Sequence, residues 1–350
     1  MEPGRRNSPV HLFSNFEVFM KAAVLVEPGH LVVKDVPMPQ PGPDDVLIQV
    51  TLAGICGSDA SFFHGKIVAP LPVIPGHEAV GRIVECGENV TRLKVGQRVT
   101  IQPNFSCRTC PVCLAGHENI CPSKIRLGID TDGVFAEYVK VPAAYVWPIP
   151  ETLGDETAVF AEPSAVACHC LKILTPREGN RVLIFGAGVI GLLTLQLAKL
   201  HTAEVTAYDI NPQHLSLAQR VGASHIIASP EETGRFHDRF DVIYETSGAE
   251  SALSQTIELA APAAKIVLLG LPARAYPLSA TMIVRKELQI SGSIIYTNEF
   301  PDAIDNLLSG RIQTEPLISG RVTLSELNRS LSDLSSPDRV KMLVNVSQNE

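Results

Sequence analysis

Four cysteines lie close together in the chain with the spacing C-x2-C-x2-C-x7-C: Cys107, Cys110, Cys113 and Cys121. Four thiolates from one loop match a closed tetrahedral zinc site, which leaves no position open for chemistry. An iron–sulfur cluster also uses four thiolates, so the spacing leaves that alternative open. Zinc would stabilise a long loop that lacks a core of its own.

A second, sparser set of possible ligands combines sulfur, nitrogen and oxygen. It contains Cys56 within Gly54–Asp59, the neighbours His77 and Glu78, and Glu162 in an Ala-Glu-Pro sequence. Mixed donors scattered through a chain suit a catalytic zinc with one open position. The other three cysteines lack ligand-like spacing and are expected to pack as small apolar residues: Cys86, Cys168 and Cys170.

A glycine turn with the pattern G-x-G-x-x-G follows the predicted strand Arg181–Phe185 and opens a predicted helix. Gly186 allows the tight turn, and Gly188 lets the backbone approach a pyrophosphate at the helix N-terminus. Gly191 lets the helix pack close to the strand. Asp209 lies 18 residues beyond Gly191, at the end of the next predicted strand. An acid at this distance is expected to bind the ribose 2′-hydroxyl of a dinucleotide.

Asp209 also favours NAD over NADP as the cofactor. A carboxylate accepts a hydrogen bond from a 2′-hydroxyl and repels a 2′-phosphate. The three following residues, Ile210–Pro212, supply no arginine that could bind the phosphate.

Composition limits the classes of partner. The chain has 350 residues, enough for about two domains, and 45% of them are hydrophobic, which allows a large core. A formal net charge of −8 disfavours nucleic acid or an anionic membrane as the main partner. The apolar run Val182–Ala198 is broken by glycines, so no membrane span is expected. We expect a cytoplasmic protein without a signal peptide, in which residues 1–19 form an N-terminal extension.

The elements that must position these residues change character along the chain. Residues 20–150 are punctuated by proline and glycine and contain short β-rich runs. After residue 160, strands alternate with helices, which indicates a parallel sheet covered on both faces. The last 50 residues predict two or three helices and a final strand, Lys341–Val346.

Taken together, these motifs resemble the zinc-containing medium-chain dehydrogenase/reductase superfamily, closest to its polyol (sorbitol-type) and threonine dehydrogenase branches. The resemblance extends from about residue 20 to the C-terminus and rests on seven motifs: Gly54–Asp59, Gly76–Gly81, Val95–Val99, the four cysteines, Asp132–Tyr138, Glu162-Pro163 and Gly186–Gly191.

The resemblance implies an α/β chain of two domains. A GroES-like β-rich catalytic domain would comprise residues 20–163 and 296–350, with a structural zinc lobe at 104–124. A Rossmann doubly wound NAD-binding domain would comprise residues 164–295, and the active site would lie in the cleft between the domains.

The resemblance also implies roles for single residues. Cys56 and His77 would be zinc ligands, with either Glu78 or Glu162 as the third. Ser58 would begin a proton relay and Asp59 would orient the histidine. The cofactor contacts would be the glycine turn and the ends of the following strands: Gly186, Gly188, Val189, Ile190, Gly191, Asp209, Thr246, Gly248, Leu269–Leu271 and Ser293.

Three departures from the family concern the proton relay and the substrate. Ser61 replaces a relay histidine, for which His64 or water would substitute. Phe62 stands where polyol dehydrogenases often have tyrosine, and Ile295 where they tend to have arginine. These changes favour a less polar secondary alcohol, or a polyol bound by other groups.

The leading interpretation is a dehydrogenase with two zinc ions per chain that passes hydride from a secondary alcohol or polyol to NAD, giving a ketone. One alternative is an L-threonine 3-dehydrogenase-like amino-alcohol oxidation. Another is a non-catalytic protein that binds zinc and a nucleotide. The family implies a homotetramer or homodimer, with Leu278–Val284 as the candidate edge segment between subunits.

Overall fold

The computed structural model describes residues 18–272, 274–275, 278–333, 336 and 338–346. Most of the predicted N-terminal extension therefore lies outside the described residues, and the first strand begins at Phe19. None of the helices in these ranges is both long enough and apolar enough to cross a membrane.

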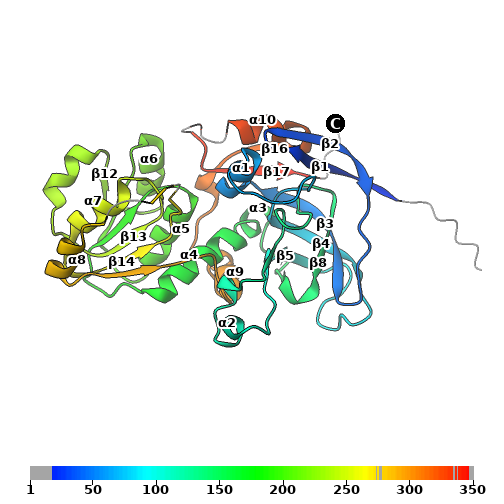
Figure 1. Ribbon diagram of the computed structural model, residues 1–350, viewed down its shortest axis with the longest axis horizontal. Coiled ribbons are helices and arrows are strands. Elements are labelled where there is room, and N and C mark those ends of the chain that lie inside the picture. The colour runs from blue at the N-terminus through cyan, green and yellow to red at the C-terminus, as the bar shows by residue number, and fades with distance from the viewer. Residues whose placement is uncertain (1–17, 273, 276–277, 334–335, 337, 347–350) are drawn as a thin grey trace, which may run out of the picture.

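A mixed sheet forms the first half of the molecule, on the right in Figure 1. Its order is β16-β17-β3-β4-β5-β9, and β8 also pairs with β3. Beside it lies a hairpin of two antiparallel strands, β1 and β2. Short strands separated by proline and glycine were predicted here. The bounds are β1 Phe19–Glu27, β2 His30–Pro37, β3 Asp45–Gly54, β4 Glu78–Cys86, β5 Arg98–Ile101, β8 Tyr138–Pro142, β9 Val146–Pro148, β16 Ile318–Thr323 and β17 Lys341–Asn345.

A six-stranded parallel sheet forms the other half, in the order β12-β11-β10-β13-β14-β15. The chain order reverses at the β10/β13 pair, and such a switch point is where α/β sheets bind ligands. The strands are β10 Val182–Phe185, β11 Val205–Tyr208, β12 His225–Ile227, β13 Phe240–Glu245, β14 Ala260–Leu268 and β15 Gln289–Gly292. The helices are α5 Val189–Ala198, α6 Pro212–Arg220, α7 Ala252–Leu259 and α8 Ala280–Lys286. The predicted fold class, a GroES-like domain with a Rossmann sheet, is confirmed, whereas its residue boundaries stay a prediction.

Two helices, α4 (Ala161–Ile173) and α9 (Phe300–Leu308), lie between the sheets (Figure 1). One apolar core includes Leu52 of β3, Val80 of β4, much of α4 and the strands and helices around the glycine turn. Because this core is continuous, burial of apolar area holds the two halves together. The remaining short elements are α1 Gly57–Phe63, α2 Pro111–Leu114, α3 Asp155–Ala158, α10 Leu327–Ser332, β6 Asn104–Phe105 and β7 Ile125–Arg126.

Three local features add to what the sequence indicated. The candidate edge segment Leu278–Val284 contains the start of α8, where the Ser279 hydroxyl accepts a hydrogen bond from Met282 N. The last strand of the parallel sheet is β15, and the role of the segment between subunits stays a prediction. β14 begins at Ala260, directly after the last residue of α7. Near the C-terminus the sequence also missed β16, which pairs in parallel with β17.

Candidate metal centre and dinucleotide cleft

Cys56, His77 and Glu78 form one of the two groups of possible metal ligands among the described residues. One ligand atom from each lies within 4.8 Å of the others. Cys56 lies two residues after the end of β3 and is the N-cap of α1, while His77 and Glu78 lie where β4 begins. Antiparallel pairing puts Gly54 opposite Glu78. A Cβ at Gly54 would lie 2.3 Å from a Glu78 carboxylate oxygen, so a larger residue there would displace that carboxylate.

Asp59 holds two members of this group in place. Its buried carboxylate accepts a hydrogen bond from Cys56 N at 2.8 Å and lies 3.2 Å from His77 Nδ1. A carboxylate on one imidazole nitrogen leaves the other nitrogen available as a ligand. Burial alone would lower the pKa of His77, but Asp59 and Cys56 raise it well above its usual value. A cation is therefore favoured at this point of the structure.

Glu78 is also paired with a buried lysine that the sequence analysis missed. Lys341, at the start of β17, forms an ion pair with the Glu78 carboxylate and donates to Ile55 O at 3.2 Å. Burial alone would lower the pKa of Lys341, but Glu78 raises it. Lys341 lies 263 residues from Glu78 in the chain. No local spacing could have predicted the pair.

Glu162 lies apart from the ligand group among the described residues, on the first turn of α4. Burial raises the pKa of its carboxyl, His77 lowers it and Glu78 raises it, and together these effects bring it to about 7. The Tyr296 hydroxyl contributes a hydrogen bond, and Asn104 Nδ2 in turn donates to that hydroxyl at 3.1 Å. The geometry thus brings Glu78 rather than Glu162 together with Cys56 and His77.

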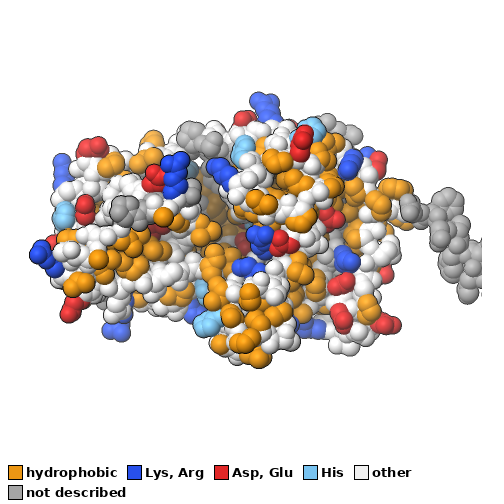
Figure 2. Space-filling view, in the orientation of Figure 1, with side chains coloured by type: hydrophobic (Ala, Val, Ile, Leu, Met, Phe, Trp, Pro, Cys, Tyr) orange, Lys and Arg blue, Asp and Glu red, His pale blue; other side chains and the backbone are white. Residues whose placement is uncertain are grey.

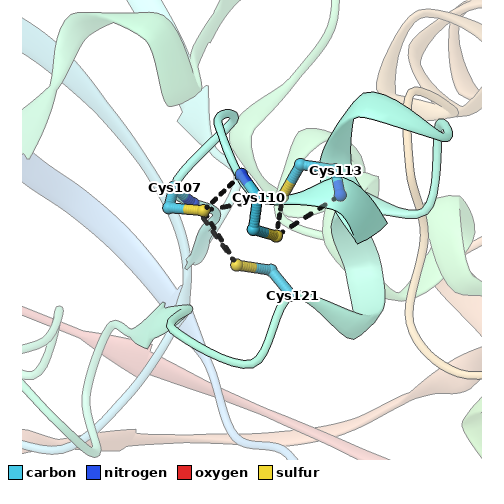
Figure 3. Close-up of side chains that lie close together, drawn as sticks. All are labelled: Cys107, Cys110, Cys113 and Cys121. Atoms are coloured by element: carbon cyan, nitrogen blue, oxygen red, sulfur yellow. Dashed lines mark hydrogen bonds between the residues drawn. The ribbon is translucent and has the colours of Figure 1, made fainter.

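The four clustered cysteines form the second group (Figure 3). Three of their sulfur–sulfur distances are 3.4, 3.5 and 3.9 Å, and all eight cysteines of the chain are free of disulfides. A tetrahedron with Zn–S bonds of ~2.3 Å separates its sulfurs by about 3.8 Å. Backbone N–H groups of three of the cysteines donate hydrogen bonds to the sulfurs, and such bonds stabilise thiolates. Hydrogen bonds from Thr109 and Cys110 lower the pKa of Cys107 to about 6. The donor set and spacing fit a structural zinc.

A cleft of about 630 Å³ lies between the two halves of the molecule. In Figure 2 it is the hollow at the centre, with basic side chains along its edge on the right. The three possible ligands Cys56, His77 and Glu78 line the cleft. Glu162 and Ser58 line it as well. So do most of the residues expected at the cofactor: Gly188, Val189, Ile190, Gly191, Thr246, Leu269, Leu271 and Ser293. The other expected cofactor residues are absent from this lining: Gly186, Asp209, Gly248 and Gly270.

The glycine turn has the steric features that a dinucleotide site needs. Gly186 has φ +99°, and a Cβ on Gly191 would lie 1.9 Å from Gly186 O. A Cβ on Gly188 would meet nothing within 4 Å, so the protein leaves space on that side. Thr246 Oγ1 donates to Gly186 O at 2.8 Å and ties the turn to the end of β13.

Asp209 is held against the glycine turn as a carboxylate. It accepts hydrogen bonds from Ala187 N at 2.7 Å and Asn211 N at 2.9 Å, and its Oδ2 lies 3.4 Å from His214 Nδ1. Burial alone would raise the pKa of Asp209, but His214 and the two backbone donors lower it. His214 was not predicted.

The structure also changes two expectations about the pocket. Phe62 is 2% exposed in the core of the first half and is absent from the cleft lining, whereas Ile295 lines the cleft. His64 is exposed at the end of α1 and is likewise absent from that lining. Four basic residues on the cleft wall were missed: Lys124, Arg126, Arg339 and Lys341.

Comparison with known proteins agrees with this geometry. Residues 42–151 match the alcohol dehydrogenase GroES-like domain family, and residues 189–309 match the zinc-binding dehydrogenase family. The chain is 33% identical to sorbitol dehydrogenase of Bacillus subtilis over 321 residues, which cover 88% of this chain and 91% of that one.

Two solved structures are also similar. A zinc-binding dehydrogenase from Sinorhizobium meliloti, bound to NADP, superposes with a TM-score of 0.90 at 34% identity and covers 94% of this chain and 99% of its own. An alcohol dehydrogenase from Escherichia coli, complexed with NADH, superposes with a TM-score of 0.88 at 33% identity and covers 93% of this chain and 99% of its own. Proteins of this fold thus bind either dinucleotide.

Proposed function

The chain belongs to the zinc-containing medium-chain dehydrogenase/reductase superfamily, and we propose that it oxidises a secondary alcohol or polyol to a ketone, with hydride passing to NAD. One observation carries the proposal: Cys56, His77 and Glu78 converge on a cleft that the glycine turn also lines. A protein that only bound zinc and a nucleotide would have no need of an incomplete ligand set facing that space.

The ligand set would hold a catalytic zinc through Cys56, His77 and Glu78, with Asp59 fixing the imidazole. Bound there, zinc would supply Lewis-acid polarisation that lowers the pKa of a hydroxyl group. Glu78, whose charge is balanced by Lys341, is the third ligand in this proposal, and Glu162 takes another role.

Two side chains are placed to handle the proton that leaves the substrate hydroxyl. Ser58 Oγ lines the cleft and can accept it first. Glu162 also lines the cleft, and its carboxylate is a second group that can take up the proton. With His64 outside the cleft lining, the route to solvent depends on Glu162 or water.

The cofactor would lie with its pyrophosphate at Gly188–Gly191 and its adenosine ribose at Asp209. Backbone N–H groups at the start of α5 bind the phosphates, because the helix N-terminus favours negative charge. The charged state of Asp209 favours NAD over NADP. Thr246, Leu269 and Ser293 would then contact the nicotinamide half.

Metal analysis combined with turnover tests this proposal. We expect about two zinc ions per chain, falling to about one in both Cys56→Ser and Cys107→Ser. Cys56→Ser should abolish NAD reduction while NAD binding survives, and Cys86→Ser is the matched control that should change neither. A Cys56→Ser protein that keeps both its metal and its turnover would show that the catalytic site is elsewhere.

The amino-alcohol alternative is tested by offering L-threonine in the same assay. A homotetramer or homodimer stays a prediction, for which light scattering is the measurement. A cytoplasmic location also stays a prediction.

A further inference from the structure

Basic side chains distinguish the outer wall of the cleft from the metal centre. Lys124 and Arg126 come from the segment that closes the four-cysteine lobe, and Arg339 precedes β17. Their neighbours in the cleft lining are uncharged: Pro103, Asn104, Leu127 and Ile129. The chain as a whole is acidic, so cations gathered at this place need a reason.

Two of these cations already have partners. Arg126 holds the Asp130 carboxylate with both Nε and Nη2, at 2.8 and 2.7 Å. Arg339 donates from Nη1 to Ser330 O at 3.0 Å. One end of the Arg126 guanidinium, Nη1, has no carboxylate on it in the described part of the chain.

Lys124, like Arg339, has only a neutral hydrogen-bond partner among the described residues. Nζ donates to Asn119 O at 2.8 Å, and no carboxylate within the described ranges lies at ion-pair distance. Lys124 is half-buried, and burial lowers its pKa. An ammonium has three donors, so at least two remain for a ligand. Placing a charge in a partly buried cleft is costly unless a counter-charge arrives.

We infer that the substrate is a small polyhydroxy acid whose carboxylate binds Lys124 Nζ, with help from Arg126, while a secondary hydroxyl reaches the Cys56–His77–Glu78 centre. This inference rests on the proposed dehydrogenase function and names its substrate class. With an apolar residue, Ile295, at this point of the lining, the cleft holds the substrate by its charged end.

A carboxylate fits this wall better than a phosphate ester does. A carboxylate carries one negative charge, which one free ammonium balances. A phosphate ester carries nearly two at neutral pH, and the cation that lies two residues from Lys124, Arg126, is already neutralised by Asp130. The Asp130 carboxylate would also repel the extra charge.

The test uses the zinc-loaded full chain and three matched series: six-carbon aldonates in their stereoisomeric forms, the corresponding alditols and the alditol phosphates. The best aldonate should exceed its alditol by about 10- to 100-fold in kcat/KM, as expected for a charge-assisted hydrogen bond. Lys124→Met should remove that advantage through KM with kcat retained, and Lys124→Arg should restore part of it. Lys140→Met, which removes an exposed lysine on β8, is the charge-matched control.

Binding gives a second readout that does not depend on turnover. Calorimetry of the aldonate with the NADH-saturated protein should show the same loss of affinity in Lys124→Met, while the affinity for NADH itself stays unchanged. A loss of NADH affinity would mean that Lys124 serves the cofactor, which overturns the inference.

The remaining outcomes separate this inference from the proposed function. If alditols are turned over as fast as aldonates, and Lys124→Met changes neither rate, the inference of an acid substrate is wrong. The proposed dehydrogenase function would be unaffected by that result. A preference for alditol phosphates would show that the basic wall binds a phosphate rather than a carboxylate. Failure to oxidise any alcohol, with zinc and NAD bound, would overturn both proposals.

Discussion

Alanine at two glycines of the turn should produce opposite defects. Gly191 and Gly188 are three residues apart in one motif, and the same methyl group is added at each. At Gly191 the new Cβ would lie 1.9 Å from Gly186 O and 2.8 Å from Thr246 Oγ1. At Gly188 it would meet no protein atom within 4 Å and would point into the space proposed for the pyrophosphate.

The size of the first defect follows from this geometry. Side-chain Cβ atoms essentially never approach another atom closer than 3.0 Å, so the backbone at Gly191 must move by at least 1.1 Å, the difference between 3.0 and 1.9 Å. Overpacking of this kind costs about 1–3 kcal/mol. At roughly 2–4 °C per kcal/mol, Gly191→Ala should lower the melting temperature by about 2–12 °C. Gly188→Ala should leave it unchanged or raise it slightly, because alanine restricts the unfolded chain.

Thermal unfolding and NAD titration of both variants measure these effects. Gly188→Ala should bind NAD about 10-fold or more weakly while unfolding like the native protein, since one or two backbone hydrogen bonds to phosphate would be lost. The reasoning is refuted if Gly188→Ala binds NAD normally, because the turn would then not hold the pyrophosphate. Equal melting temperatures for Gly191→Ala and the native chain would refute the steric argument.

Two further predictions concern buried charges away from the cleft. Lys286 Nζ donates to the carbonyls of Ile257, Glu258 and Ala260 at the end of α7. Lys286→Met should therefore lower the free energy of urea unfolding by about 2–3 kcal/mol, whereas Lys265→Met, at an exposed position, should change it little. Glu299 is 0% exposed, and although burial alone would raise its pKa, His169 and Lys172 lower it from 4.5 to about 2. The Glu299 carboxylate contributes its full stabilisation above pH ~4.5 and loses it as the pH falls towards ~2. The difference in free energy of unfolding between the native protein and Glu299→Gln should therefore shrink between these two pH values. At neutral pH we expect the free energy of unfolding of the native protein to exceed that of Glu299→Gln by about 1–2 kcal/mol, because the half-exposed Lys172 is screened by solvent. A difference that stayed constant down to pH 2 would contradict the lowered pKa of Glu299.

Local spacing predicted the parts of the site that lie within one segment. The four cysteines occupy a stretch of 15 residues, so their convergence needs only a tight loop. The glycine turn is equally local, because strand, turn and helix follow one another directly. Alternation of strands and helices likewise predicted the parallel sheet. These features depend on short-range sterics, which a sequence displays directly.

Contacts between distant segments were decided only by the tertiary structure. The sequence left Glu78 and Glu162 as equal candidates for the metal, and the pairing of β3 with β4 brings Glu78 to Cys56. Lys341 reaches Glu78 because β17 is inserted beside β3, and Lys124 faces the cleft because the lobe folds back onto it. A lysine has the same appearance in a sequence whether it ends in solvent or beside a buried carboxylate. Its surroundings come from chain packing over hundreds of residues, and that packing determines the charge of the site.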